Sequence, residues 1–160
     1  MKRLSEELYK SPDETLAGNI LACIPQQSPF RFIDRILSID ENHVVGTYTY
    51  KSNESFYQGH FPDFPVTPGV ILTETMAQIG LVSLGVYLCG ADPLFLKSAR
   101  IFFTSSNVQF HKMVRPGDQV WVESQKEYFR LRKLQCKVAM FNQDGKKICA
   151  GTLSGMFSNP

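Results

Sequence analysis

The stretch PVTPGVILTETMAQIGLVSLGVYLC, residues 65–89, decides the fold of this chain. Pro68 suits the first turn of a helix, and the residues after it place apolar groups on every face, as in a buried helix. Glu74 is the only charged residue between Asp63 and Asp92. We therefore expect one long core helix that carries a single carboxylate.

The uncharged part of this stretch is slightly shorter than the roughly 18 apolar residues that suggest a membrane span. Gln78, Ser83 and two glycines make it less apolar, and sequence rich in strand-forming residues surrounds it. We therefore expect a helix wrapped by a sheet, and no membrane span.

The sequence on both sides of this helix has the composition and spacing of strands. β-Branched and aromatic residues are frequent, and apolar residues alternate with polar or small ones. Turn sequences such as Pro116-Gly117-Asp118 separate the strands. Two strands are expected before the helix and about four after it, over 30–39, 43–51, 101–110, from 120 onwards, 134–140 and 148–157. This order predicts an α+β fold, a curved antiparallel sheet wrapped around one long central helix.

Composition narrows the class of protein. The 160 residues are 43% hydrophobic and have a formal net charge of +2, which suits one globular core and disfavours a dedicated nucleic-acid binder. We expect a single domain over 1–160, with residues 1–19 as an N-terminal arm and a first helix that starts at Ser11-Pro12. The absence of a secretory signal predicts a cytoplasmic protein. The four cysteines have no paired spacing, which predicts buried free thiols.

One histidine and one carboxylate lie near the start of the predicted helix. Prolines and glycines stiffen the loop that holds His60, while Glu74 falls on the second helical turn. Burial of a lone carboxylate raises its pKa, so the pair would suit proton transfer beside a carbonyl. The helix start near Gly69 adds unpaired N–H groups that can bind a carbonyl oxygen. Spacing alone leaves open that Glu74 pairs with a basic residue and that His60 only caps a loop.

Three motifs in this region carry a family resemblance. They are Gly-His-Phe-Pro at 59–62, Pro-Val-x-Pro-Gly-Val at 65–70 and Glu-x-Met-Ala-Gln at 74–78. Together they resemble the signature of the β-hydroxyacyl-[acyl-carrier-protein] dehydratases of the FabZ type, which have the hot-dog fold. The resemblance extends over roughly residues 20–157, through PFRFIDR at 29–35 and FHKMVRPGD at 110–118.

The resemblance implies removal of water from a 3-hydroxyacyl thioester to give a trans-2-enoyl thioester, without a metal or redox cofactor. His60 matches the family's catalytic histidine, which would take the α-proton. Glu74 matches its catalytic glutamate, which would protonate or orient the departing 3-hydroxyl, and a glutamate here resembles the dehydratase-only type. The family builds this site across a homodimer, and such dimers often assemble into trimers of dimers.

The same resemblance assigns residues to substrate and partner. The N–H of Gly69 would bind the thioester oxygen, and the substrate-binding candidates are Gly69, Val70, Phe61, Gln78, Ile101, Phe102 and Phe103. The implied partner is acyl carrier protein, which is acidic and needs a basic surface for docking. The available cations are Lys97, Arg100, Lys112, Arg115, Arg130, Arg132 and Lys133. His43 and His111 are expected to be surface or strand histidines.

Three places depart from the family pattern, and they leave acyl length and pathway open. Asp63-Phe64 replaces a small-then-basic pair, Arg31 stands where an apolar residue is usual, and Ser105-Ser106 stands where an apolar residue and an aspartate are usual. The alternatives are a hot-dog thioesterase, a dehydratase of a specialised pathway, and an acyl-binding subunit without catalytic activity.

Overall fold

The structure is a computed structural model that describes residues 4–9, 12–90 and 100–158. Its helical elements are η1 (Glu6–Leu8), α1 (Glu14–Cys23), η2 (Ser55–Gln58), α2 (Gly69–Ala77), the π-helical turn η3 (Gln78–Val82) and α3 (Ser83–Leu88). Its strands are β1 (Arg35–Ile39), β2 (His43–Thr49), β3 (Arg100–Phe110), β4 (Gln119–Arg130), β5 (Lys133–Asn142) and β6 (Lys147–Ser158).

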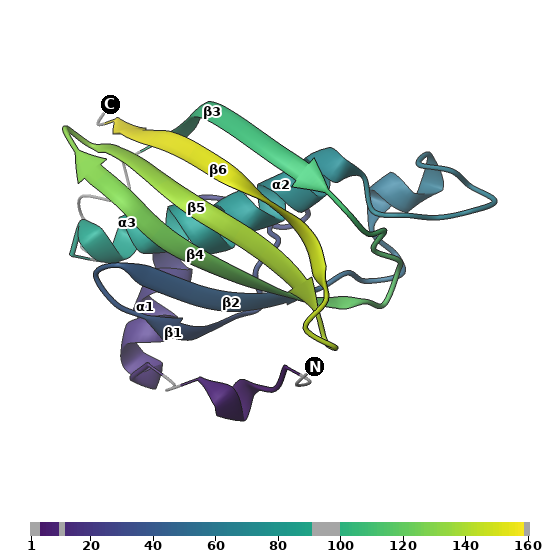
Figure 1. Cartoon of the computed structure of the whole chain (residues 1–160), viewed down its shortest axis with the longest axis horizontal. Coiled ribbons are helices and arrows are strands. Elements are labelled where there is room, and N and C mark those ends of the chain that lie inside the picture. Colours follow the sequence, from purple (N-terminus) through teal and green to yellow (C-terminus); the bar gives the residue numbers. More distant parts are fainter. Residues whose placement is uncertain (1–3, 10–11, 91–99, 159–160) are drawn as a thin grey trace.

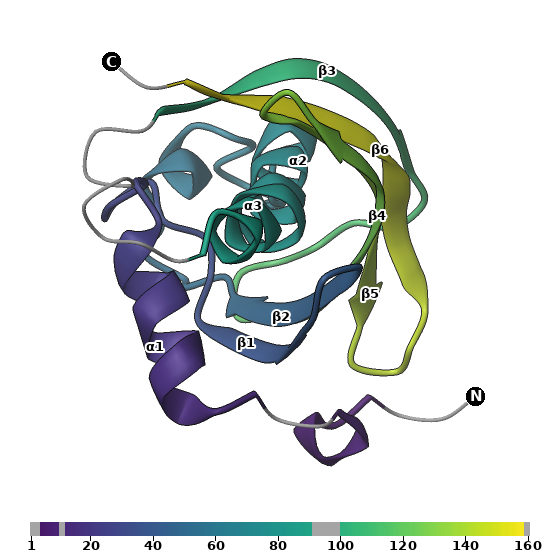
Figure 2. The same ribbon diagram turned by 90° about the vertical axis from the view of Figure 1, so that its left-hand side faces the viewer.

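Within the described residues, one antiparallel sheet of six strands forms the framework, in the order β1-β2-β4-β5-β6-β3. Figure 1 shows its strands lying across the helix formed by α2, η3 and α3. Seen along that helix, the sheet curls around it, and α1 lies beside the end of the sheet formed by β1 (Figure 2). The predicted α+β fold with a central helix is confirmed, including the order of two strands, one helix and four strands.

The two strands before the central helix are shorter than predicted, whereas the four after it differ from the prediction by only one or two residues at their ends. β1 begins at Arg35 rather than at residue 30, because the C=O of Phe30 and the N–H of Phe32 bond to the side chain of Gln78 instead of to a strand. β2 ends at Thr49, short of the predicted boundary at residue 51. The segment before β1 is therefore irregular backbone held by the central helix.

The central helix runs without a break from Gly69 to Leu88. By length and composition it could cross a membrane, but 72% of its apolar window is buried inside the protein. Its π-helical turn leaves backbone groups that need other partners. The hydroxyl of Ser83 donates to the C=O of Gln78 (2.9 Å), and the hydroxyl of Ser124 on β4 donates to the C=O of Gly80 (2.8 Å). These bonds fix the turn against the sheet.

The core lies between the central helix and the concave side of the sheet. Met76, Ile79 and Leu84 of the helix are fully buried there. All four cysteines are free, as predicted; Cys136 and Cys149 are buried, and the other two are half-buried. The central helix is thus held firmly by the core, and it carries Glu74 of the candidate site.

The N-terminal helix starts later than predicted. It begins at Glu14, with Asp13 as its N-cap, and the Asp13 carboxylate accepts a hydrogen bond from the N–H of Thr15 (2.8 Å). This capping contact stabilises the first turn of the helix. Ser11, which we predicted at the helix start, lies outside the described residues.

β3 is an edge strand, because it is the last strand in the sheet and pairs only with β6 within the described residues. Nearly all of its residues are exposed, and its pairing with β6 shifts between Phe103 and Ser105. An exposed edge with large apolar side chains is a surface that proteins normally cover. The strand therefore presents an uncovered edge of the single chain.

Candidate active site

His60 lies in the irregular loop between η2 and α2, and a main-chain contact fixes its ring. Its Nδ1 is 2.9 Å from the carbonyl oxygen of Val66. A carbonyl can only accept a hydrogen bond, so Nδ1 carries the proton and donates. In the neutral ring, Nε2 then has a free lone pair, which is the arrangement of a base. The ring also packs against that of Phe61, with centroids 4.3 Å apart and the two planes tilted by 40°.

Two further contacts hold the loop around Val66. The hydroxyl groups of Tyr57 and Thr67 lie 2.6 Å apart in a buried hydrogen bond. The N–H of Thr67 donates to the C=O of Val114, 2.8 Å away. Both contacts hold Thr67, the residue that follows Val66, and so fix the main chain next to the carbonyl that orients His60.

Glu74 lies on the second turn of α2 and is half-buried. Its Oε1 accepts a hydrogen bond from Nε2 of Gln78 (2.8 Å). Burial raises the pKa of Glu74, and the bond from Gln78 opposes that rise only in part. Within the described part of the chain, no basic side chain forms an ion pair with it. The predicted raised pKa is confirmed, and the alternative of a basic partner is wrong for these residues.

Gln78 has a different position from the one expected of a substrate-binding residue. Its side chain is fully buried, and both of its polar atoms are already bonded to Phe30, Phe32 and Glu74. A direct contact between this amide and a substrate would require those bonds to break. The geometry supports a contact with Glu74 instead.

Gly69 is the first residue of α2, and the ring of Phe110 lies beside it. A Cβ added at Gly69 would be 3.2 Å from Cζ of Phe110, closer than ordinary van der Waals contact. Within the described residues, the N–H of Gly69 has no hydrogen-bond acceptor. The sequence motif pointed to Gly69, but Phe110 was not among the predicted site residues, because its place beside the helix depends on tertiary structure.

The remaining substrate-binding candidates are apolar residues that are mostly exposed in the single chain. Val70 is 76% exposed, Phe61 and Phe102 are each 57% exposed, and Phe103 is 45% exposed. Ile101 is half-buried at the start of β3. These side chains come from the His60 loop, from the start of α2 and from the edge strand. In the single chain they face outward.

His60 and Glu74 are not joined within one chain. Among the described residues, His60 bonds to the carbonyl of Val66 and Glu74 bonds to Gln78, and no hydrogen bond or ion pair links the two. The sequence prediction that both are held by rigid structure is supported by these contacts. Their meeting at one pocket stays a prediction.

The candidate cations for carrier-protein docking are mostly exposed. Arg100, Lys112, Arg115, Arg130 and Arg132 are exposed and Lys133 is half-buried, whereas Lys97 lies outside the described residues. The β4–β5 hairpin that carries three of them has Leu131 at its tip, 87% exposed.

The departures from the family pattern have structural partners. The guanidinium group of Arg31 donates to the C=O of Leu21 in the last turn of α1 (2.8 Å), a favourable place for a cation. The guanidinium group of Arg115 lies 5.5 Å from the ring centre of Phe64. Ser105 and Ser106 lie on the exposed edge strand.

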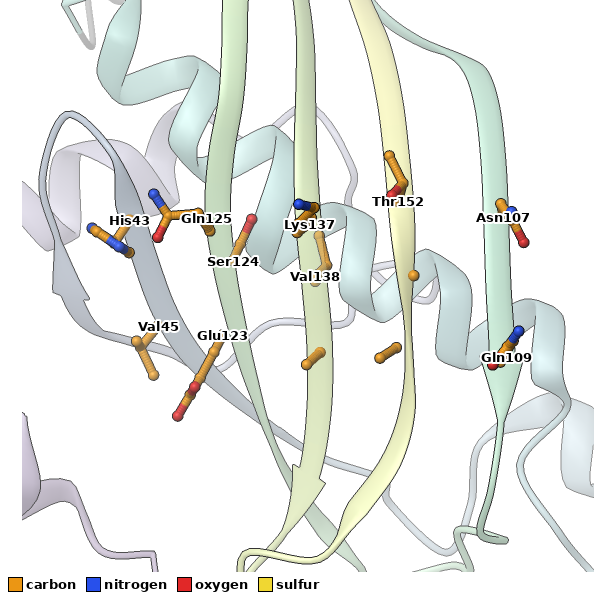
Figure 3. Close-up of a pocket in the computed structure, with 13 residues that line it drawn as sticks. His43, Val45, Asn107, Gln109, Glu123, Ser124, Gln125, Lys137, Val138 and Thr152 are labelled. Atoms are coloured by element: carbon orange, nitrogen blue, oxygen red, sulfur yellow. The ribbon is translucent and has the colours of Figure 1, made fainter.

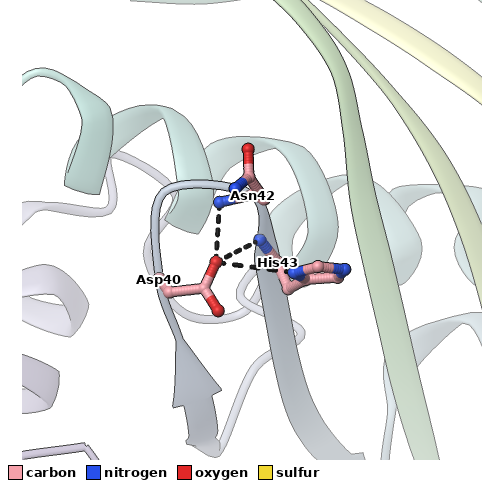
Figure 4. A network of polar contacts seen from close by, with 3 residues as sticks. All are labelled: Asp40, Asn42 and His43. Carbon is pink, nitrogen blue, oxygen red and sulfur yellow. Dashed lines mark hydrogen bonds and ion pairs between the residues drawn. The ribbon is translucent and has the colours of Figure 1, made fainter.

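His43 belongs to a hairpin turn rather than to the site. The Asp40 carboxylate accepts hydrogen bonds from the N–H groups of Asn42 (2.7 Å) and His43 (2.9 Å), as Figure 4 shows. The bond from Asn42 contributes most to lowering the pKa of Asp40. His111 is exposed just after β3. Both histidines lie where the sequence placed them, away from a catalytic position.

The sheet also has a hollow of about 720 Å³ on the side away from the helix (Figure 3). Its lining includes His43, Glu123 and Lys137, together with small residues of β5 and β6. None of the predicted site residues lines it. The hollow is therefore separate from the candidate site.

Comparison with known proteins shows a family match. The model of the FabA-like domain matches residues 24–152. A 3-hydroxyacyl-[acyl-carrier-protein] dehydratase FabZ of a Geobacillus species is 42% identical over 106 residues, 65% of this chain and 69% of the relative. The FabZ of Caldicellulosiruptor bescii is 36% identical over 136 residues, 84% of this chain and 92% of the relative.

Solved structures share the fold at lower identity. A dehydratase heterocomplex, ApeI:P of Xenorhabdus doucetiae, has a TM-score of 0.70 at 13% identity and covers 88% of this chain and 91% of its own. A hypothetical thioesterase of Streptococcus pneumoniae, solved with coenzyme A, has a TM-score of 0.55 at 18% identity and covers 78% and 84%. At these identities the structural similarity is evidence of a shared fold only.

Proposed function

This chain belongs to the FabA-like family and, within it, to the FabZ-type dehydratases, and from this premise we propose the reaction that its site performs. The enzyme is a hydro-lyase of fatty-acid biosynthesis. It removes water from 3-hydroxyacyl-[acyl-carrier-protein] thioesters and forms trans-2-enoyl thioesters. The observation that carries the proposal is the pair of prepared groups, a histidine with a free Nε2 and a carboxyl group with a raised pKa.

The two groups divide the proton transfers between them. Nε2 of His60 takes the α-proton, and the electron pair of the C–H bond forms the new double bond. The C–O bond at the 3-position breaks, and the leaving hydroxide takes the proton of Glu74 to become water. A proton then returns from His60 to Glu74 through water. Because both steps use side chains of this chain, we propose that no metal or redox cofactor takes part.

The start of α2 supplies the third group. Negative charge develops on the thioester oxygen when the α-proton leaves. The N–H of Gly69, at the positive end of the helix dipole, donates a hydrogen bond to that oxygen. The ring of Phe110 lies beside Gly69, and an added Cβ would be only 3.2 Å from it, a tight contact.

The site is completed in a homodimer. Among the described residues, no hydrogen bond or ion pair joins His60 to Glu74 within one chain. The edge strand carries exposed apolar side chains, and one of them, Phe110, lies beside Gly69 at the start of α2. Antiparallel pairing of β3 with β3 of a second copy covers this surface and brings His60 of one protomer to Glu74 of the other. Trimers of dimers are a further assembly that we propose for this family member.

Acyl carrier protein is the proposed substrate carrier, and the cytoplasm the proposed location. The exposed arginines and lysines of the β4–β5 hairpin and of the segment after β3 provide the basic surface that an acidic carrier requires. In the dimer, antiparallel β3 strands place the hairpin end of one protomer near the His60 end of the other.

The reaction is tested with purified protein and 3-hydroxyacyl-carrier-protein thioesters of several acyl lengths. We expect conjugated enoyl product with no release of free thiol. Release of thiol without enoyl product would show a thioesterase and overturn the proposal. His60→Ala and Glu74→Gln are each expected to lose most of the turnover while keeping the circular dichroism of the wild type.

The shared site has its own test, because the two variants damage different halves of it. In a heterodimer of His60→Ala and Glu74→Gln protomers, one of the two sites contains both wild-type groups. After co-expression with random pairing, activity is expected to recover to about a quarter of the wild-type value. No recovery in a mixed dimer would place both groups of a site in one chain.

A further inference from the structure

Gln78 connects three parts of the protein through one side-chain amide. Its Oε1 accepts a hydrogen bond from the N–H of Phe32 (2.6 Å), and its Nε2 donates to the C=O of Phe30 (3.0 Å) and to Oε1 of Glu74 (2.8 Å). The side chain is fully buried. Every hydrogen of the amide therefore has a partner.

The two main-chain contacts settle which way the amide points. Phe32 offers a donor and Phe30 an acceptor, so the oxygen of Gln78 faces Phe32 and the nitrogen faces Phe30. The second hydrogen on Nε2 is then directed at Glu74. A reversed amide would set the Gln78 oxygen against the C=O of Phe30 and its nitrogen against the N–H of Phe32.

This orientation has a consequence for the carboxyl group of Glu74. Oε1 receives a hydrogen from Gln78, so it acts as an acceptor. When Glu74 is protonated, its proton is therefore carried on Oε2, the atom that Gln78 does not contact. A catalytic acid with its proton on a defined atom is aimed before the substrate arrives.

The segment that holds Gln78 is itself held by the N-terminal helix. Arg31 lies between the two residues that Gln78 contacts, and its guanidinium group donates to the C=O of Leu21 in α1. Arg31 is one of the departures from the family pattern. It links the position of α1 to the segment that fixes Gln78.

The helix geometry supports the same contact. Gln78 is the first residue of the π-helical turn, and its own C=O accepts the hydroxyl of Ser83. Single π-helical turns inside α-helices are frequent at functional sites. The turn is thus anchored at the residue that bonds to Glu74.

We propose that Gln78 is a positioning residue that assigns the acidic proton of Glu74 to Oε2, and that α1 supports it through Arg31. This inference rests on the proposed function, since it names how the acid of that site is oriented. Gln78 itself does not touch the substrate.

The test compares Gln78→Met, which keeps the length of the side chain and removes the amide, with Met76→Leu, a volume-conserving change at a buried site of the same helix. We expect kcat of Gln78→Met to fall about tenfold with little change in KM, as for the loss of one hydrogen bond. Met76→Leu is expected to keep near-wild-type kinetics. If Gln78→Met does not fold, Gln78→Asn serves in its place, because it retains the amide and shortens its reach.

A pH profile separates positioning from a merely structural role. The bond from Gln78 lowers the pKa of Glu74, whereas burial raises it. Among the described residues, no charged group shifts this pKa further. Without the amide, Glu74 stays protonated to higher pH, so the alkaline limb of kcat moves upward. An unmoved limb in the folded variant, or a change in KM alone, overturns the proposal.

A readout without turnover keeps the result distinct from failure of the proposed reaction. In protein labelled with ¹³C at glutamate carboxyl groups, the Glu74 signal is assigned by its loss in Glu74→Gln. Its titration midpoint is expected to be higher in Gln78→Met than in the wild type, and Arg31→Leu is expected to shift it less in the same direction. An unchanged midpoint in Gln78→Met refutes the role of Gln78 even if the enzyme proves to have another activity.

Discussion

Gly85, on the central helix, allows the sharpest prediction about how the fold is packed. A Cβ added there would lie 1.7 Å from Cζ of Phe157 on β6, far inside van der Waals contact. Phe157 is almost fully buried and packs edge-on against Phe129, with centroids 6.2 Å apart. Gly85→Ala therefore forces the ring, the helix or the strand to move by about 2 Å.

The cost of this change can be set against a known gain. Overpacking of a core costs about 1–3 kcal/mol, whereas replacing glycine by alanine inside a helix contributes about 1 kcal/mol of stability. Because the clash is severe, we take the overpacking cost at the upper end of its range. After the gain in helix propensity, Gly85→Ala is expected to lose about 2 kcal/mol of stability, which for a chain of this size lowers Tm by about 4–8 °C.

Gly18 provides the matched control, because it lies in α1 and an added Cβ would meet no atom within 4 Å. Gly18→Ala is expected to gain up to about 1 kcal/mol from helix propensity alone. Both variants are measured by thermal unfolding followed by circular dichroism. A Gly85→Ala protein as stable as Gly18→Ala would refute the argument that Phe157 requires a glycine opposite it.

Three further changes test other contacts. Folding raises the pKa of Glu74, so the folded state binds more protons than the unfolded state and loses stability as pH rises from about 4.5 to the folded pKa. Glu74→Gln should remove that loss of stability. Unfolding curves of the variant that keep the wild-type pH dependence would contradict this prediction. Tyr57→Phe leaves the buried Thr67 hydroxyl without its partner, so we expect the free energy of urea unfolding to fall by about 1–3 kcal/mol and kcat to fall as well. Unchanged values would show that the bond between Tyr57 and Thr67 does not help to hold His60. Leu131 has a φ of 49° and is 87% exposed; Leu131→Asn should gain up to about 1 kcal/mol, and a loss of Tm would show that the leucine packs on something.

The order of elements was predictable because each leaves a local signal. The apolar stretch around Glu74 reads as a buried helix, and the alternating residues of β5 read as a strand with one buried face. β1 was placed too early because Phe30, Phe32 and Ile33 have strand-like composition. Their main-chain groups bond to a side chain 46 and 48 positions away, which no local periodicity reveals.

The two titratable residues of the candidate site could be chosen from the sequence, but the contacts that hold them could not. His60 and Glu74 stand out because a titratable residue is rare in such a loop and on such a helix. The partner of His60 is a main-chain carbonyl, which every residue type possesses. The identity of residue 66 as valine therefore gives no sign of this contact. Gln78 was visible as part of a motif, but its role follows from burial, and burial is a property of the folded chain.

The contacts that hold His60 and Glu74 have a common property, which bears on the shared site that we propose. The proton on His60 is placed by the carbonyl of Val66, and the carboxyl group of Glu74 is placed by Gln78, each within its own chain. Neither arrangement needs the second protomer. In the dimer that we propose, association would only have to bring two prepared groups together. The precision of the chemistry would then depend on the fold of each chain, and burial of the apolar edge strand would supply the free energy of association.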